Sequence, residues 1–173
     1  LRGGVVAIGN FDGVHRGHQA MLARLVEAAE DLRLPPAVLT FEPHPREFFA
    51  AAAAPPRLSP LRTKLELFRA YGVATTYVAR FDARLASVAA GDFVRDVLEA
   101  RLQARWVLVG EDFRFGRGRQ GDLAALRSTS TRFSVEAMRT VAVDGERASS
   151  TAVRAALAAG EVRHAAALLG RNY

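Results

Sequence analysis

The sequence contains no cysteine, which excludes a disulfide framework, a cysteine-based zinc site and a thiol nucleophile. It also lacks an apolar run of the roughly 18 residues that a membrane-spanning helix needs, and it does not start with a signal-peptide pattern. Half of its 173 residues are apolar, as in a globular chain of about one domain. We therefore expect a cytoplasmic protein without a membrane partner.

Lysine is nearly absent too, since Lys64 is the only one and arginine supplies the remaining positive charge. The formal net charge is +6 and the calculated pI is about 10.8, which is typical of nucleic-acid-binding proteins. The arginines are scattered over predicted helix faces instead of forming one run, so a compositional bias explains the charge better. We expect no nucleic-acid partner, although a positive field attracts anionic substrates.

Two common nucleotide-binding signatures are missing or misplaced. The Walker pattern G-x-x-x-x-G-K-[ST] does not occur, and Lys64 lies outside any glycine-rich loop. Residues 116–121 match G-x-G-x-x-G, but 111–115 separate them from the preceding predicted strand, whereas the dinucleotide fingerprint joins strand to helix directly. We predict neither a Walker-type kinase nor an NAD site, and we interpret 116–121 as a mobile loop.

Short apolar runs alternate with amphipathic segments along the chain. The predicted strands are Val5–Ile8, Ala37–Phe41, Thr75–Ala79 and Trp106–Val109. The predicted helices are Gly17–Leu32, Lys64–Tyr71, Asp92–Gln103, Thr151–Ala158 and Glu161–Leu169. We expect an irregular connection over 42–60 and extended or hairpin structure over Arg132–Val143. This alternation predicts an α/β fold, with a mostly parallel sheet and helices on both faces.

A glycine-rich loop with two histidines follows the first predicted strand. It reads Gly9-Asn10-Phe11-Asp12-Gly13-Val14-His15-Arg16-Gly17-His18. Open α/β sheets bind ligands at the carboxyl ends of their strands, and the next helix presents free N–H groups that favour phosphate. Imidazolium groups at His15 and His18 would stabilise negative charge on a phosphate in transfer. One such histidine would suit an ordinary surface position, but two in this loop indicate phosphate chemistry.

A second motif begins a helix near the end of the chain and reads Ser149-Ser150-Thr151-Ala152-Val153-Arg154. Ser149 or Ser150 suits the helix N-cap, and Arg154 shares a helix face with Ser150 and Thr151. Hydroxyls, free amides and a guanidinium together make a polyphosphate clamp. In isolation the same residues fit a plain capped helix with a solvent-exposed arginine equally well.

Two phenylalanine-bearing segments follow the second and fourth predicted strands, and both therefore lie at the same edge of the sheet as the first loop. They read Phe41-Glu42-Pro43-His44-Pro45-Arg46 and Gly110-Glu111-Asp112-Phe113-Arg114-Phe115-Gly116. Aromatic rings can flank a flat ligand, and Arg46 could pair with a phosphate. Core packing is the alternative role for Phe113 and Phe115.

The quartet His15-Arg16-Gly17-His18 resembles the H-x-G-H signature of the nucleotidyltransferase superfamily, and the second motif resembles its S-S-T-x-x-R phosphate motif. The ten-residue string and both phenylalanine segments are similar to the bacterial FAD synthetase family. Its members usually carry an FMN adenylyltransferase module followed by a riboflavin kinase module. The resemblance implies a Rossmann-like nucleotidyltransferase fold with a small extended or hairpin insertion, and transfer of AMP from ATP to FMN, giving FAD and pyrophosphate.

We expect residues 1–173 to form the FMN adenylyltransferase module, with the riboflavin kinase module absent from this chain. The sequence departs from the family pattern at Ala148, where a larger aliphatic residue is usual, and at Asn172, where proline is common. Neither position belongs to the motifs that carry the chemistry.

The resemblance assigns roles to the motif residues. The expected catalytic residues are His15, His18 and Arg154. The expected ATP-binding residues are Gly9, Asn10, Phe11, Asp12, Gly17, Ser149, Ser150 and Thr151. The expected flavin-binding residues are Phe41, Pro43, His44, Pro45, Arg46, Asp112, Phe113 and Phe115. Mg²⁺ is expected to accompany ATP, and the sequence identifies no ligand for it.

Two other functions stay open at this level. A related transferase could use another acceptor, such as nicotinamide mononucleotide, phosphopantetheine or a phosphocholine-type substrate, although both phenylalanine segments argue against that. A non-catalytic basic binding module is the second alternative.

Overall fold

A five-stranded parallel sheet organises the structure, a computed structural model that describes residues 3–173. Its strands are β1 (Val5–Ile8), β2 (Pro36–Glu42), β3 (Thr75–Arg80), β4 (Trp106–Gly110) and β5 (Ser134–Met138). They lie in the order β3-β2-β1-β4-β5, and all four strand pairs are parallel. The strand order reverses between β1 and β4, which is where open α/β sheets bind ligands.

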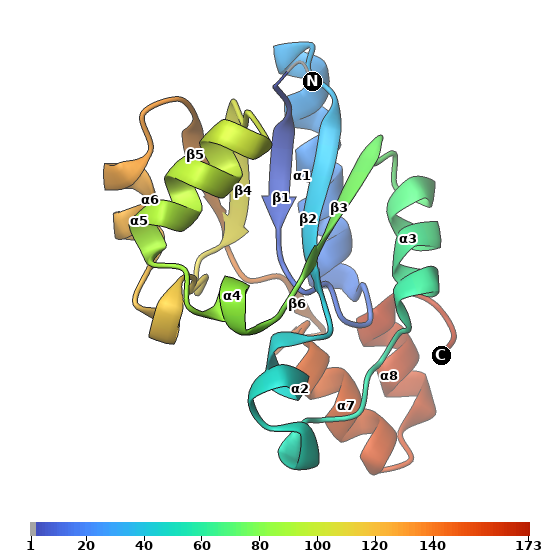
Figure 1. Cartoon of the computed structure of the whole chain (residues 1–173). Coiled ribbons are helices and arrows are strands. Elements are labelled where there is room, and N and C mark those ends of the chain that lie inside the picture. The colour runs from blue at the N-terminus through green and yellow to red at the C-terminus, as the bar shows by residue number, and fades with distance from the viewer. Residues whose placement is uncertain (1–2) are drawn as a thin grey trace.

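Helices cover both faces of this sheet (Figure 1). One face packs against α1 (Arg16–Leu32) and α3 (Leu61–Ala70). The other packs against η2 (Phe93–Arg101), which continues α5 (Ala90–Asp92), and against α6 (Leu123–Thr129). The strand β1 is buried throughout, and its side chains alternate between the two cores, as expected for a strand covered on both sides.

The carboxyl edge of the sheet is covered by a separate layer, seen below the strands in Figure 1. This layer contains α2 (Pro45–Phe49), η1 (Ala51–Ala53), α7 (Ser150–Ala158) and α8 (Val162–Leu169). The helices α7 and α8 pack around a small core of their own, formed by Leu58, Ala148, Val153, Leu168 and Leu169. The short hairpin of β6 (Ala142–Val143) and β7 (Glu146–Arg147) leads into α7. The remaining short elements are α4 (Ala83–Ala86) and η3 (Arg117–Arg119).

The predicted α/β fold with a parallel sheet is confirmed, and the expected strands and long helices all form. The interpretation of Arg132–Val143 is wrong in part, because Ser134–Met138 forms a fifth parallel strand beside β4. Only 142–147 form a hairpin. The segment lacks a continuous apolar run because β5 is an edge strand, covered less completely than the central strands.

The expectation of an irregular connection over 42–60 is also wrong in part, since α2 and η1 lie within it. Pro45 occupies the first turn of α2, where its missing N–H costs nothing. The ring nitrogen Nδ1 of His44 accepts a hydrogen bond from the Arg46 N–H and so caps the helix. His44 therefore acts locally as a helix cap.

Residues 116–121 form a short turn within the connection from β4 to α6, and residues 111–115 separate this turn from the strand. The backbone of Phe115 pairs with that of Gly121 across the turn. Gly116 has a φ of +73°, and a side chain there would come within 2.7 Å of the Ala90 backbone. The start of the turn is thus packed against the beginning of α5.

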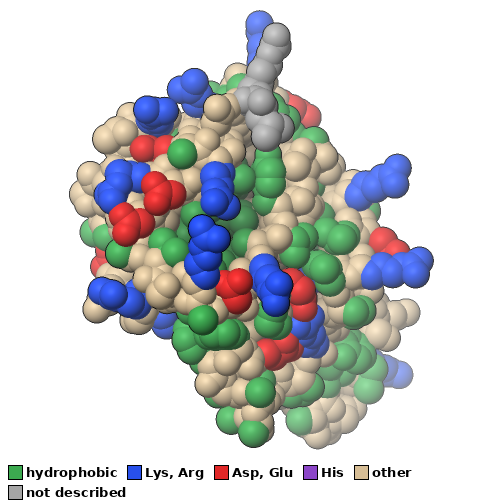
Figure 2. All heavy atoms as spheres, in the orientation of Figure 1, with side chains coloured by type: hydrophobic (Ala, Val, Ile, Leu, Met, Phe, Trp, Pro, Cys, Tyr) green, Lys and Arg blue, Asp and Glu red, His purple; other side chains and the backbone are tan. Residues whose placement is uncertain are grey.

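No helix within residues 3–173 combines the length and the apolar character needed to cross a membrane. On the face shown in Figure 2, Lys and Arg side chains are scattered and alternate with Asp and Glu. This face therefore carries no continuous basic track.

We predict that Leu25→Ala destabilises the fold by about 2–5 kcal/mol, because it removes a fully buried side chain of α1 from the core between this helix and the sheet. Leu32→Ala is the matched control on the same helix, since Leu32 is 48% exposed. Urea unfolding measures both. Equal losses in the two variants would contradict the assignment of this core.

Candidate functional site

A large aromatic cavity of about 720 Å³ opens at the carboxyl edge of the sheet. Eight of the residues expected to contact ligands line it: Gly9, Asn10, Phe41, Pro45, Arg46, Asp112, Phe113 and Phe115. Further lining residues that the sequence analysis missed include Phe49, Phe81, Phe93 and Arg114. The size and the aromatic lining suit a flat organic ligand with a charged group.

A smaller cavity of about 280 Å³ lies over the amino-terminal end of α1. Its lining includes the expected residues Gly9, Phe11, His15, Gly17, His18 and Ser149. It also includes residues that the sequence analysis missed, among them Met138, Arg139, Thr140 and Arg147. Met138 ends β5 and Arg139 and Thr140 follow it directly, and the sequence analysis did not recognise that strand as part of the sheet.

The two cavities adjoin, because Gly9, Asp112 and Phe113 line both. Gly9 follows β1 and Asp112 follows β4, so the junction lies at the reversal of strand order. The Asp112 carboxylate accepts a hydrogen bond of 2.7 Å from the Arg147 guanidinium, which ties the loop after β4 to β7. A group bound in one cavity can therefore reach a group bound in the other.

The histidine loop, residues 9–15, positions the paired imidazoles. The rings of His15 and His18 stack with centroids 3.7 Å apart, and Phe11 packs against His18. The ring nitrogens Nδ1 of both histidines are buried and have no hydrogen-bond partner within residues 3–173. Buried polar atoms without a partner are uncommon and costly, so this pair marks the two histidines as candidate functional residues.

Gly17 allows the close packing around this pair. A Cβ at this position would lie 3.2 Å from the ring nitrogen Nδ1 of His15 and 3.1 Å from the Ala148 carbonyl oxygen. A larger residue would push the imidazole away from the start of α7. The glycine between the two histidines therefore allows this close packing without displacement of the His15 ring.

The pKa of His15 is lowered to about 4, first by burial and then by the positive charges of Arg147 and Arg171. The pKa of His18 is also well below its usual value, because of burial and then of His15 and Lys64. Both imidazoles are neutral near pH 7, which corrects the expectation of imidazolium groups. A neutral imidazole still offers one N–H donor.

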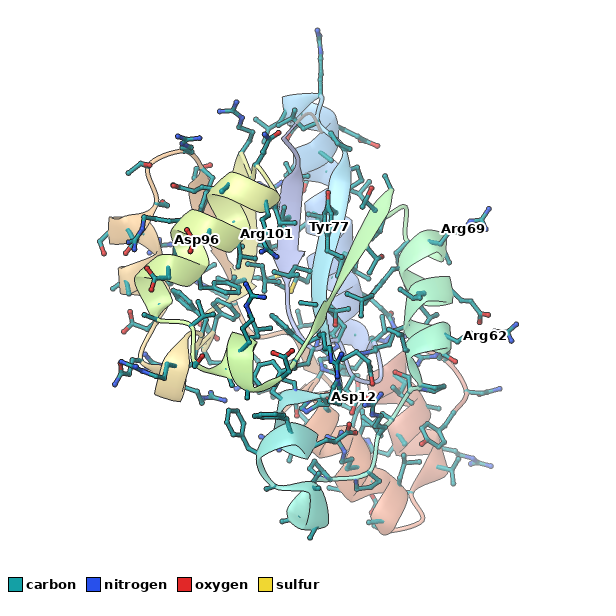
Figure 3. The ribbon with its side chains drawn as sticks, viewed as in Figure 1. Asp12, Arg62, Arg69, Tyr77, Asp96 and Arg101 are labelled. Carbon is teal, nitrogen blue, oxygen red and sulfur yellow. The ribbon has the colours of Figure 1, made fainter. Side chains whose placement is uncertain are left out.

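Asp12 connects the histidine loop to the layer beneath the sheet (Figure 3). Its carboxylate is buried and accepts hydrogen bonds from the N–H groups of Leu58 (3.0 Å) and Ser59 (3.1 Å). It also pairs with the Arg154 guanidinium, which donates a further bond of 2.7 Å to the Pro56 carbonyl. The ion pair between Asp12 and Arg154 thus fixes the position of both side chains in this structure.

The serine-rich motif begins α7 as expected. Ser149 is the N-cap, and its hydroxyl accepts a hydrogen bond of 3.1 Å from the Ala152 N–H. The Ser150 hydroxyl donates to the Asp12 carbonyl at 2.8 Å, and Thr151 is exposed on the first turn. Of these residues only Ser149 lines either cavity.

Six expected site residues line neither cavity: Asp12, Pro43, His44, Ser150, Thr151 and Arg154. Within residues 3–173, no three His, Asp or Glu side chains form a group that could hold a metal ion.

Comparison with protein families finds a match to the FAD synthetase family model over residues 1–152. A bifunctional riboflavin kinase/FMN adenylyltransferase of Haemophilus influenzae is 43% identical over 175 residues. The alignment covers 100% of this chain and 57% of that relative. A putative enzyme of the same description from Geobacillus thermodenitrificans is 42% identical, with 98% of this chain and 91% of the relative covered.

Among solved structures, one named as a macrolide-efflux protein of Streptococcus pneumoniae superimposes with a TM-score of 0.86. It is 26% identical, and the match covers 99% of this chain and 57% of that chain. The chain therefore spans just over half the length of these two longer proteins.

We predict that the His15 ring titrates with a pKa of about 4, because burial disfavours its charged form. The fold is then more stable when His15 is neutral than when it is protonated. The unfolded chain has a histidine pKa near 6.5 and binds more protons between these values, so this contribution is lost as the pH falls from 6.5 towards 4. Histidine NMR titration measures the pKa. The free energy of unfolding should fall less steeply with acid in His15→Gln, and a ring that titrated near 6.5 would contradict the assignment.

Proposed function

The chain belongs to the FAD synthetase family, and we propose that it is an FMN adenylyltransferase that converts FMN and ATP to FAD and pyrophosphate. The observation that carries the proposal is the pair of stacked histidines that line the smaller cavity, which adjoins the aromatic cavity. The relatives named above are described as bifunctional, and we assign only the adenylyltransferase reaction to residues 1–173. We place this reaction in the cytoplasm, where ATP is available.

The smaller cavity is the proposed site of the ATP phosphates. His15 and His18 line this cavity, and their imidazoles would donate hydrogen bonds to the α-phosphate. Ser149 lines the same cavity at the amino-terminal end of α7, where free N–H groups and the helix dipole favour an anion. An anionic phosphate raises the pKa of an adjacent histidine, so binding strengthens both imidazoles as donors.

The larger cavity is the proposed site of FMN. Its volume of about 720 Å³ and its aromatic lining suit an isoalloxazine ring flanked by side chains. Arg46 and Arg114 line it as well and could bind the FMN phosphate. The phosphate would then point through the junction at Gly9 and Asp112 towards ATP.

The reaction is an in-line displacement. An oxygen of the FMN phosphate forms a bond to the α-phosphorus of ATP while the bond to the bridging oxygen breaks, and pyrophosphate leaves with that electron pair. A phosphomonoester has its second pKa near 6, so the attacking oxygen arrives ionised and needs no general base. The contribution of His15 and His18 is therefore positioning and stabilisation of the charge at the α-phosphate.

Arg154 is the proposed partner of the leaving pyrophosphate, together with Ser150 and Thr151. In the structure its guanidinium pairs with Asp12 and with the Pro56 carbonyl. It would exchange the carboxylate for the β- and γ-phosphates when ATP binds, since both are strong charge-assisted acceptors. Asp12 would keep its two backbone donors, Leu58 and Ser59, throughout this exchange.

Mg²⁺ is proposed to enter with the substrate as MgATP. This ion is usually bound by substrate phosphates and only one or two carboxylates, so it needs no preformed cluster of acidic side chains. This mode of binding is compatible with the described residues, among which no cluster of three or more acidic or histidine side chains occurs.

We predict that the wild-type chain makes FAD from FMN, ATP and Mg²⁺, and that His18→Ala lowers kcat about 10²–10³-fold, as for loss of one preorganised donor. Release of pyrophosphate and the fluorescence change of FAD follow the reaction. Parallel incubations replace FMN with nicotinamide mononucleotide, phosphopantetheine or a phosphocholine-type acceptor. Near-full FAD synthesis by His18→Ala would refute the role of the histidine, and turnover of another acceptor alone would refute FMN as the substrate.

We predict that Phe49→Ala raises KM for FMN about 2- to 10-fold, because an aromatic pair contributes about 0.5–1.5 kcal/mol. Phe49 lines the larger cavity and is 66% exposed, so its removal should leave the core intact. KM for ATP should not change. Phe48→Ala is the control, since this neighbouring ring does not line the cavity; an equal rise in both variants would count against direct contact.

A further inference from the structure

The end of the chain contacts the histidine loop through one arginine. Arg171 follows α8, and its NH2 group donates a hydrogen bond of 2.7 Å to the Gly13 carbonyl. Its NH1 group donates to the Val14 carbonyl at 3.2 Å and to the Leu169 carbonyl at 3.4 Å. One planar guanidinium therefore binds two successive carbonyls of the loop that leads into His15.

The backbone bound by Arg171 is in an uncommon conformation. Gly13 has a φ of +81°, and Val14, a β-branched residue, has a φ of +40°. A β-branched side chain is rarely found at positive φ, and such a conformation costs of order 1–3 kcal/mol. It persists only where the surroundings hold it, and the Arg171 hydrogen bonds are part of that support.

Gln19, at the end of the first turn of α1, binds the same carbonyl. Its Nε2 group donates to Val14 at 2.9 Å and also to the Leu169 carbonyl. Gly170 makes this approach possible, because a Cβ there would lie 2.9 Å from the Gln19 side-chain oxygen. The turn after α8 is thus fitted closely against the loop and the start of α1.

The bound carbonyl of Val14 belongs to the peptide group that it shares with His15. In a trans peptide the C=O and N–H groups point in opposite directions, so fixing the carbonyl also fixes the direction of the His15 N–H. His15 is in turn the N-cap residue of α1, with an extended backbone. The peptide plane therefore constrains how the backbone of His15 enters the helix, and with it the point from which the imidazole side chain extends.

We infer that Arg171 is a positioning residue for the adenylyl transfer proposed above: by binding the carbonyls of Gly13 and Val14 it fixes the histidine loop and, through it, His15. Arg171 lines neither cavity, so it acts through the loop and not on the substrate. This inference rests on the proposed function for its effect on turnover, but its effect on the loop is independent of that function.

A purely structural tie between α1 and α8 is the alternative, and the chain offers a matched control for it. The Nε group of Arg16 donates a hydrogen bond of 3.2 Å to the Ala167 carbonyl. Arg16→Ala removes a guanidinium contact between the same two helices but leaves the loop carbonyls of Gly13 and Val14 bound. If Arg171 only ties the two helices together, Arg16→Ala and Arg171→Ala should change kcat and loop exchange equally. If Arg171 positions the loop, Arg171→Ala should have the larger effect on both.

The experiment measures turnover and loop protection in the same variants. We expect Arg171→Ala to lower kcat for FAD formation about 10- to 100-fold, since a displacement of about 1 Å at a reacting group costs that order of rate. KM for FMN should stay within about twofold of the wild type. We expect Arg171→Lys to be intermediate in kcat, since an ammonium keeps the charge but lacks the planar fork.

Hydrogen–deuterium exchange of the substrate-free protein gives the readout that does not depend on catalysis. Amides of residues 11–15 should exchange faster in Arg171→Ala than in Arg16→Ala or the wild type. If Arg171→Ala does not fold, Gln19→Met tests the same loop carbonyl and should raise the same exchange. Wild-type kcat in Arg171→Lys, equal effects of Arg16→Ala and Arg171→Ala, or unchanged loop exchange would each overturn the inference. Failure of the wild type to make FAD with the exchange pattern intact would overturn only the proposed function.

Discussion

The candidate site depends on the reversal of strand order beside β1. The chain leaves β1 towards α1 on one face of the sheet, whereas the chain that leaves β4 reaches α6 on the other. The loops after these two neighbouring strands therefore diverge and leave a crevice at the carboxyl edge. Gly9 and Asp112 stand at its two sides and line both cavities. The proposed binding sites of ATP and FMN therefore meet at the crevice that the strand order creates between these two loops.

The layer beneath the sheet is attached to this crevice mainly by polar contacts. The helices α7 and α8 have a small apolar core of their own, and one buried ion pair together with hydrogen bonds joins this layer to the histidine loop. Asp12 binds Arg154, and Arg171 binds the carbonyls of Gly13 and Val14. Such contacts need accurate geometry to offset the loss of hydration, so they couple the loop conformation to the position of both helices.

Local sequence was enough to predict the histidine loop, the cap of α7 and the central strands, because each depends on neighbouring residues. The fifth strand was missed, since its alternating, half-buried pattern acquires meaning only beside β4. The cavity residues at and after the end of this strand, such as Met138 and Thr140, were missed for the same reason. Phe49 and Phe81 were missed for a related reason: their rings meet, at 5.7 Å between centroids, only after α2 folds against the end of β3.

The sequence by itself determined the chemical groups and their order: a glycine loop with two histidines, a serine-capped helix and two phenylalanine segments on one edge of a parallel sheet. The tertiary structure decided how these groups behave. Burial made both histidines neutral, because a charged imidazole loses its hydration there. Folding also placed Arg154 on Asp12 and Arg171 on the loop carbonyls, since only packing brings residues about 150 positions apart into contact.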